Sequence, residues 1–405
     1  MSTIRKWLTI RNHGPSVTIL VRITKVETIA VRTPMREPLV WPGGTRESAS
    51  GLLVQIHTDE GIVGIGEAPG PTLPTIRTII EEELSQFLVG QDPLRVEWLV
   101  HRMEEFSRNW SRIANYAISG IEIALLDLKG KSLGVPVAEL LGGFSRDRVA
   151  VVGYLFIDEP EAAARKAGAF VDAGYSELKL KVGRSFEQDH DTLAAIRDRV
   201  GSDVKIRIDA NMIWSVPAAI KWIRGLEQFD LQYVEQPVLD FDVQGLAQVR
   251  RSVAVPIAAD EGCTDVRSAL ELIKADACDV LVVYPSEAGG LTKARQIGAL
   301  ADAAGKWCAI GSWAELGVAT AGNLHVVASS SNFPFASDTH YPLQQFDVLE
   351  ERLEMSDGLV EVPRAPGLGV TLDPSEVERL SNFEVRESVF YDDIHGEAPR
   401  VGQIL

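Results

Sequence analysis

The strongest constraint on the fold is a repeat of short apolar segments and amphipathic helices that begins near Val149. There are about eight such units, each roughly 25 to 30 residues long, and "VKIRIDAN" followed by "SVPAAIKWIRGLEQF" is one of them. This alternation predicts parallel strands joined by right-handed crossovers, and eight parallel strands close a barrel. We therefore predict an α/β fold with a TIM-type barrel over residues 147–370. A doubly wound sheet is the alternative, but no glycine-rich phosphate loop follows the first strand.

Residues 21–146 have a different pattern, which predicts a separate α+β domain. Two alternating stretches, "VRITKVETIAV" and "SASGLLVQIHTDEGIVGIGEA", read as antiparallel strands with a turn at Asp59-Glu60-Gly61, and helical periodicity follows. The polar segment 371–405 is predicted to return to this domain. Residues 1–20 are predicted to be a loosely attached extension, since they lack the apolar core and cleavage site of a secretory signal.

Charge and composition narrow the classes of function. The chain has 405 residues and a net charge of −17, which disfavours nucleic acid or an anionic membrane as a partner. No uncharged apolar run is long enough to span a bilayer. The 3 cysteines form no CxxC motif, which fits a reducing compartment. We expect a cytoplasmic protein that acts on a small molecule.

Three carboxylates follow consecutive predicted barrel strands. They are Asp209 in "RIDAN", Glu235 in "VEQP" and Asp260 in "AADEG". Functional groups of such barrels lie at the carboxyl ends of the strands, so these side chains are predicted to converge at one mouth. Converging carboxylates require a cation, and an all-oxygen ligand set favours Mg²⁺, with Mn²⁺ as the alternative. Each acid alone could instead cap the following helix, but three matching positions argue against that.

Two lysines occupy the second predicted barrel strand, "YSELKLKVG". Alternation places Lys179 and Lys181 on the same face, where two like charges are costly unless carboxylates compensate them. An edge strand facing solvent is the alternative. Beside a divalent ion, an amine can remove the α-proton of a carboxylate substrate while the ion stabilises the ene-diolate. We expect the nearby cations to lower the pKa of Lys181, so that it can act as a base.

The ordered motifs "KLK", "DAN", "EQP" and "ADE" resemble those of the enolase superfamily over most of the chain. The resemblance implies a (β/α)7β-barrel, an N-terminal capping domain and a homo-oligomer. "ADEG" and "GSWAELG" are similar to the muconate-lactonising subgroup of the mandelate racemase/muconate lactonizing enzyme family. By this resemblance, the Mg²⁺ ligands are Asp209, Glu235 and Asp260. Lys181 is then the base, while Lys179 and Asn211 support the substrate carboxylate.

One position departs from the subgroup pattern. Tyr284 stands where the subgroup has a second lysine, and Glu261 is expected to accept a hydrogen bond from its hydroxyl. A phenol with a pKa near 10 is a poor acceptor of an α-proton, whereas racemisation normally needs a base on each face. We therefore favour dehydration or cycloisomerisation with Lys181 as base, a lyase or an isomerase. A racemase or epimerase is the alternative, and a non-catalytic metal- and ligand-binding relative is another.

Substrate specificity in this family comes from a mobile loop of the capping domain, here expected at Thr33–Ser48. Its side chains Arg36, Trp41 and Arg46 are predicted to meet a hydroxylated or second anionic end of the substrate, unless the loop is simply solvated. The other predicted pocket residues are Tyr154, Asn211, Glu261, Ser312, Trp313, Glu315 and His340. Sugar acids, hydroxy acids and amino-acid derivatives are the expected substrates.

Overall fold

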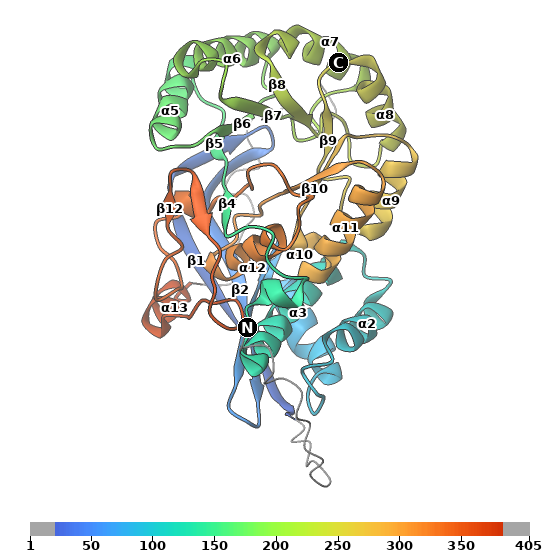
Figure 1. Cartoon of the computed structure of the whole chain (residues 1–405), viewed down its shortest axis with the longest axis vertical. Coiled ribbons are helices and arrows are strands. Elements are labelled where there is room, and N and C mark those ends of the chain that lie inside the picture. The colour runs from blue at the N-terminus through green and yellow to red at the C-terminus, as the bar shows by residue number, and fades with distance from the viewer. Residues whose placement is uncertain (1–20, 384–405) are drawn as a thin grey trace, which may run out of the picture.

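The structure, a computed structural model, describes residues 21–383. The predicted extension at 1–20 and the last part of the C-terminal segment, 384–405, lie outside the described residues. A ring of strands and helices forms one end of the molecule and the N-terminal domain forms the other, with a long β-hairpin running between them (Figure 1). No helix of the described part combines the length and apolar character that crossing a bilayer requires.

The N-terminal domain is built on an antiparallel sheet of β1 (Ile23–Trp41), β2 (Gly44–Thr58) and β3 (Val63–Pro69). The predicted turn at Asp59–Gly61 is confirmed, and Gly61 adopts a φ of +77° there. The helices of this domain are α1 (Leu73–Thr78), η1 (Ile79–Leu84), η2 (Ser85–Phe87), α2 (Val96–Ser107), α3 (Arg112–Leu133) and α4 (Val137–Leu140). The sheet packs closely on α3, and Gly66 permits this approach, since a Cβ atom there would collide with the Gly120 carbonyl oxygen.

The segment predicted as a mobile specificity loop is mostly regular structure, so the prediction of an irregular loop was wrong. β1 and β2 pair past a bulge between Pro34 and Leu39 as far as the pair Trp41–Gly44. Leu39 is buried, and this apolar anchor holds the hairpin against the rest of the molecule. The hairpin carries Trp41 and Arg46 to the barrel mouth (Figure 1).

The barrel begins with seven parallel strands in the order β11-β10-β9-β8-β7-β6-β5. Their bounds are β5 (Gly153–Leu155), β6 (Glu177–Lys181), β7 (Lys205–Asp209), β8 (Leu231–Glu235), β9 (Ile257–Ala259), β10 (Val280–Val283) and β11 (Trp307–Ile310). The eighth segment closes the gap, since the Ser337 N–H donates to the Ala150 carbonyl at 2.7 Å and the Asp338 N–H to the Ile310 carbonyl at 3.0 Å. The predicted barrel class is confirmed.

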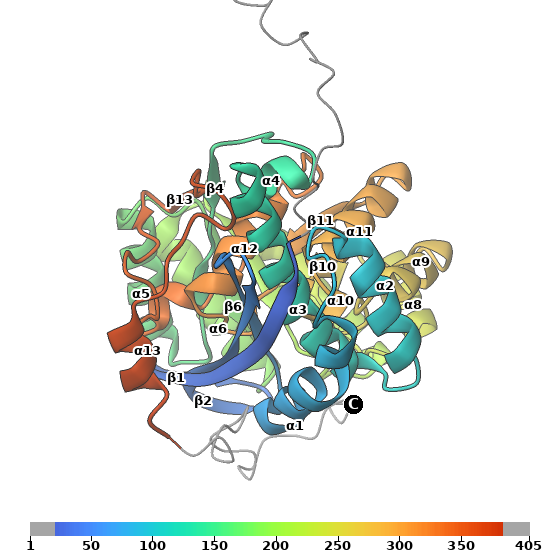
Figure 2. The ribbon, with the colours of Figure 1, turned by 90° about the horizontal axis from the view of Figure 1, so that it is seen from below.

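Helices cover the outside of this sheet (Figure 1). They are α5 (Pro160–Asp172), α6 (Phe186–Val200), α7 (Val216–Leu226), α8 (Val243–Ser252), α9 (Val266–Lys274), α11 (Leu291–Ala303) and α12 (Gly317–Ala328). A short strand, β4 (Arg148–Ala150), pairs with the hairpin of β12 (Met355–Ser356) and β13 (Leu359–Glu361). Within the described part, α13 (Pro374–Leu380) contacts β1 of the N-terminal domain (Figure 2).

Candidate active site

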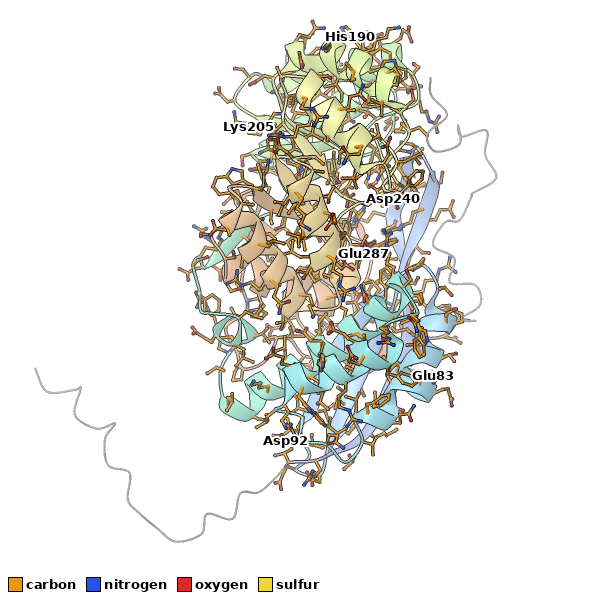
Figure 3. All side chains as sticks on the ribbon, turned by 90° about the vertical axis from the view of Figure 1, so that its right-hand side faces the viewer. Glu83, Asp92, His190, Lys205, Asp240 and Glu287 are labelled. Carbon is orange, nitrogen blue, oxygen red and sulfur yellow. The ribbon has the colours of Figure 1, made fainter. Side chains whose placement is uncertain are left out.

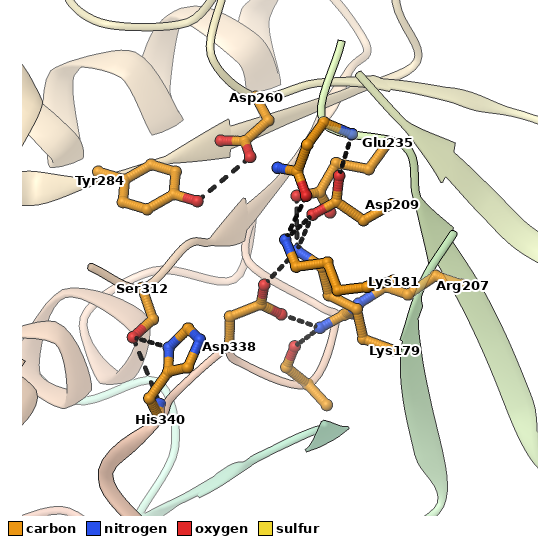
Figure 4. Close-up of polar contacts among 12 residues, drawn as sticks. Lys179, Lys181, Arg207, Asp209, Glu235, Asp260, Tyr284, Ser312, Asp338 and His340 are labelled. Atoms are coloured by element: carbon orange, nitrogen blue, oxygen red, sulfur yellow. Dashed lines mark hydrogen bonds and ion pairs between the residues drawn. The ribbon is translucent and has the colours of Figure 1, made fainter. Parts of the chain in front are cut away.

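Three neighbouring strands bring the predicted carboxylates together. Asp209 ends β7, Glu235 ends β8 in register with it, and Asp260 directly follows β9. All three side chains are buried, and each offers a carboxylate oxygen within 4.8 Å of the others (Figure 4). The parallel register of the strands therefore creates one acidic cluster at the barrel mouth.

The electrostatics of this triad fit a hard divalent cation. Within the described residues, Glu235 Oε2 and Asp260 Oδ1 are buried without a hydrogen-bond partner. Burial, followed by the charge of Asp209, raises the pKa of Glu235 to about 8. Burial and the charge of Glu261 likewise raise the pKa of Asp260 well above its usual range. Buried carboxylate oxygens with no partner are costly unless a cation binds them, and an all-oxygen set is what Mg²⁺ prefers.

The two lysines of β6 point into the barrel, so the alternative of a solvent-facing strand is wrong. Lys179 Nζ lies 2.5 Å from Glu235 Oε1, 2.6 Å from Asp338 Oδ2 and 3.0 Å from Asp209 Oδ2. Lys181 Nζ lies 2.6 Å from Asp209 Oδ2 and 2.7 Å from Asn211 Oδ1 (Figure 4). The like charges of the two ammonium groups are thus compensated by carboxylates on the neighbouring strands.

The expected lowering of the pKa of Lys181 does not occur in this arrangement. Burial is the largest single influence and acts to lower its pKa, but the charges of Asp209, Tyr154 and Glu235 together raise it overall. The same carboxylate has its own pKa held below the usual range, because Lys179 and Lys181 outweigh its burial. Asp209 is therefore paired with both lysines, whereas Glu235 Oε2 and Asp260 Oδ1 have no hydrogen-bond partner among the described residues.

Arg207 is a functional-site neighbour that the sequence analysis missed. It is fully buried on β7, and it donates from Nη2 to the Ala336 carbonyl at 2.7 Å and to Asp338 Oδ1 at 2.5 Å. Asp338 in turn accepts from Lys179, so Arg207 fixes the carboxylate that holds this lysine (Figure 4). Strand alternation could have revealed it, since Arg207 and Asp209 are two residues apart and share a face.

Tyr284 lies on β10's end, across the mouth from the lysines. Its hydroxyl donates to Asp260 Oδ2 at 3.2 Å (Figure 4). Glu261 Oε1 instead accepts from Asn211 Nδ2 at 2.9 Å. The expected bond from Tyr284 to Glu261 is therefore wrong, because the single hydroxyl proton of Tyr284 is donated to Asp260. Burial, followed by the charge of Asp260, raises the pKa of Tyr284 well above 10, which keeps the phenol protonated.

A cavity of about 270 Å³ opens above these groups. Its lining includes the predicted residues Trp41, Arg46, Tyr154, Lys181, Asn211, Asp260, Glu261, Tyr284, Ser312, Trp313 and His340. Arg112, Phe156 and Glu287 also line it and were not predicted. Lys179, Asp209 and Glu235 lie beneath this lining, and two of the predicted substrate-pocket residues lie outside it. Arg36 donates to the Pro342 carbonyl at 3.1 Å, and Glu315 is buried behind Ser312. A larger cavity of about 950 Å³ lies by β12 and β13, away from the triad.

Carboxylates of the N-terminal domain hold the loops that line this cavity. Glu67 accepts hydrogen bonds from the backbone N–H groups of Leu316 and Ala319, both at 2.8 Å, at the start of α12. Glu122 accepts from the Leu291 N–H at 2.9 Å at the start of α11. In the opposite direction, Glu287 is a barrel residue, labelled in Figure 3 where barrel and N-terminal helices meet. It accepts from the hydroxyl of Tyr116 on α3 at 2.8 Å. The N-terminal domain therefore acts as a structural support for the barrel mouth.

We expect Glu67→Ala to lower the free energy of unfolding by about 1–3 kcal/mol, because it leaves two buried backbone donors unpaired. Turnover should also fall, since the loop from Ser312 to Leu316 loses its anchor. Chemical denaturation measures the first effect. Glu97→Ala, on the exposed side of α2, is the matched control and should change neither quantity. Equal stability of the two variants would contradict the role of Glu67.

This combination of fold and site is that of the enolase superfamily. Residues 162–377 match the family described as "Enolase C-terminal domain-like", and residues 23–142 match "Mandelate racemase / muconate lactonizing enzyme, N-terminal domain". The chain belongs to the mandelate racemase/muconate lactonizing enzyme family of this superfamily.

The relatives of this chain include isomerases. A hydrophobic dipeptide epimerase from Enterococcus faecalis is 35% identical, with 87% of this chain and 100% of the relative covered. A muconate cycloisomerase from Acinetobacter lwoffii is 32% identical, with 89% and 97% covered. The crystal structure of an Enterococcus faecalis dipeptide epimerase with Mg and L-Leu-L-Tyr matches with a TM-score of 0.80 at 32% identity, covering 86% of this chain and 99% of that one.

The chain is accordingly an isomerase-type enzyme of the enolase superfamily. The family's general reaction, α-proton abstraction from a carboxylate with a divalent metal, fits these relatives. Dehydration, which the sequence analysis favoured together with cycloisomerisation, has less support than the epimerase alternative.

Proposed function

We propose that the protein isomerises a small carboxylate of the amino-acid-derivative class, and that Lys181 removes its α-proton. The observation that carries this proposal is the position of Lys181 Nζ, 2.6 Å from a carboxylate of the triad and on the lining of the cavity. The relatives support the substrate class, since one of them is an epimerase that was crystallised with a dipeptide.

The chain's own residues divide the work. Asp209, Glu235 and Asp260 would hold Mg²⁺, which when bound stabilises the negative charge that develops on the substrate carboxylate. Lys179 adds a buried positive charge beside that position, and Asp338 keeps it there. Asn211 orients Lys181 through a 2.7 Å hydrogen bond. The neutral amine of Lys181 then accepts the α-proton on one face, and a proton delivered to the opposite face, where the Tyr284 hydroxyl lies, gives the isomer by general acid–base catalysis.

Loss of water from a hydroxy acid is the second candidate function, and Tyr284 is the observation that favours it. The phenol keeps its proton, lies across the mouth from Lys181 and lines the cavity. A protonated hydroxyl can donate to a leaving group, but it is a poor acceptor on the second face of the α-carbon.

The expected homo-oligomer and the cytoplasmic location remain predictions.

Proton NMR in D₂O with Mg²⁺ tests both functions. The protein is incubated with N-acyl amino acids, dipeptides, hydroxy acids and sugar acids, and both α-proton exchange and product formation are followed. Exchange accompanied by the isomer of one substrate supports the first proposal. Loss of water on one substrate, with little exchange back into it, supports the second. Absence of exchange in every class contradicts the role of Lys181.

We expect Tyr284→Phe to slow product formation by about 100-fold or more, because the proton donor across from Lys181 is lost. Exchange of the α-proton should stay within about tenfold of the wild-type rate, since Lys181 alone performs that step. The same NMR assay measures both rates. Loss of exchange and product in equal measure would mean that Tyr284 only supports Asp260.

A further inference from the structure

A second chain of hydrogen bonds lines the cavity away from the triad. It consists of Glu315, Ser312 and His340. The Ser312 hydroxyl lies 2.7 Å from Glu315 Oε2, and His340 Nδ1 lies 2.9 Å from Ser312 Oγ (Figure 4). Neither the triad nor the two lysines bond to these three residues in the described part of the chain.

The hydrogen-bond donors in this series can be assigned by starting from Glu315, its buried end. The Ser312 hydroxyl donates its proton to Glu315 Oε2 at 2.7 Å. Burial raises the pKa of Glu315, and the hydrogen bonds from Ser312 and from the backbone N–H groups of Trp313 and Glu315 oppose that shift. Ser312 has a single proton, which it gives to Glu315, so its oxygen must accept from His340 Nδ1–H. The Ala314 N–H donates to the same oxygen at 3.1 Å, which fixes the hydroxyl further.

This assignment leaves the other ring nitrogen of His340, Nε2, without a proton. In the described structure Nε2 has no hydrogen-bond partner, and His340 lines the cavity. The ring is held in place between the protein's aromatic side chains, with centroids 4.6 Å from Tyr154 and 5.8 Å from Phe156. Burial, followed by the positive charges of Arg46 and Lys181, lowers the pKa of His340 well below its usual value, so the ring stays neutral.

We propose that His340 Nε2 is a fixed hydrogen-bond acceptor that selects substrates with an N–H donor on the α-carbon. The inference rests on the proposed function, because it assigns the substrate group that lies beside the carboxylate. His340 follows the eighth barrel segment and lines the same cavity as Lys181, away from the triad (Figure 4). In the proposed complex it therefore faces a substituent of the α-carbon, while the triad side of the cavity takes the carboxylate. Ser312 and Glu315 are positioning residues that hold the ring in the accepting tautomer.

The tautomer can be tested without any substrate. The full-length protein with Mg²⁺, labelled with ¹⁵N-histidine, contains 7 histidines, and His340→Gln identifies the His340 signal by its absence. A long-range ¹H–¹⁵N correlation should show Nδ1 protonated and Nε2 bare. Ser312→Ala should mix the two tautomers. A protonated Nε2, or an imidazolium, in the wild-type protein would overturn the proposal.

Selectivity is tested with matched probes. N-acetyl amino acids and their 2-acetoxy isosteres differ only by an N–H group in place of an oxygen. We expect α-proton exchange in D₂O to favour the N–H member, and His340→Phe to reduce that preference by about 10- to 100-fold. His340→Gln offers an acceptor oxygen and should restore part of the preference. His190→Phe, on the outer helix α6 (Figure 3), is the matched control.

The outcomes separate the two proposals. If probes exchange but His340→Phe leaves the preference unchanged, the role of His340 is wrong while the function of Lys181 stands. If no probe exchanges with the wild-type protein, the proposed function fails. The tautomer measurement then still decides whether His340 presents an acceptor to the cavity.

Discussion

Replacing Lys181 with alanine should reduce turnover by at least about 10³-fold, because the only step of the proposed reaction that breaks a carbon–hydrogen bond loses its base. Lys181 Nζ is held by Asp209 and Asn211 at 2.6 and 2.7 Å, so no other described amine can take its position without moving those partners. The α-proton exchange rate in D₂O at saturating Mg²⁺ measures the effect. Small primary amines added to Lys181→Ala should restore part of the exchange.

A second variant separates the charge of Lys181 from its basicity. Lys181→Arg keeps a positive charge beside Asp209, but a guanidinium does not give up its proton in proteins and cannot act as a base. It should therefore be as inactive as Lys181→Ala. Lys166→Ala, a surface lysine paired with Glu37, is the control and should retain full activity. An active Lys181→Arg would mean that this residue acts by charge alone.

The positions of the proposed catalytic and metal-binding residues were predictable because they depend on local pattern. Alternation along "ELKLK" decides the face of Lys179 and Lys181, and the position of Asp209 at the end of a parallel strand decides the mouth at which it lies. These inferences need only the strand assignment and the order of strands. The eight-unit repeat supplied both, and so the barrel and the triad could be derived together.

The contacts that the sequence did not reveal join residues far apart in the chain. Glu67 accepts a hydrogen bond from Ala319 at the start of α12, 252 residues away in the sequence. Tyr116 donates to Glu287, which is 171 residues away. No periodicity links such pairs, because they form only when the N-terminal domain docks on the barrel. The Thr33–Ser48 hairpin was mistaken for a loop for a related reason. The loop was expected from the family resemblance, whereas pairing of β1 with β2 and burial of Leu39 determine the structure of this segment.

Removing the divalent metal should abolish turnover, and Mg²⁺ or Mn²⁺ should restore it. The triad explains the expectation, because Glu235 Oε2 and Asp260 Oδ1 are buried with no hydrogen-bond partner in the described chain. A ligand that binds only the folded state stabilises it by about 2.7 kcal/mol at a concentration of about 100 Kd. Thermal unfolding in Mg²⁺ and in a chelator should therefore give clearly different Tm values.

Asp260→Asn should remove most of this response. An amide cannot supply the same negative charge. Mutating a residue that only hydrogen-bonds to a metal ligand typically weakens metal binding by roughly 10- to 100-fold, so loss of a direct ligand should weaken Mg²⁺ binding by at least that factor. Glu122→Gln is the matched control, because it alters a buried carboxylate that caps α11 outside the triad. That control should lower the baseline Tm and keep the Mg²⁺-dependent rise. An Asp260→Asn variant that keeps both the rise and the activity would mean that the metal binds elsewhere.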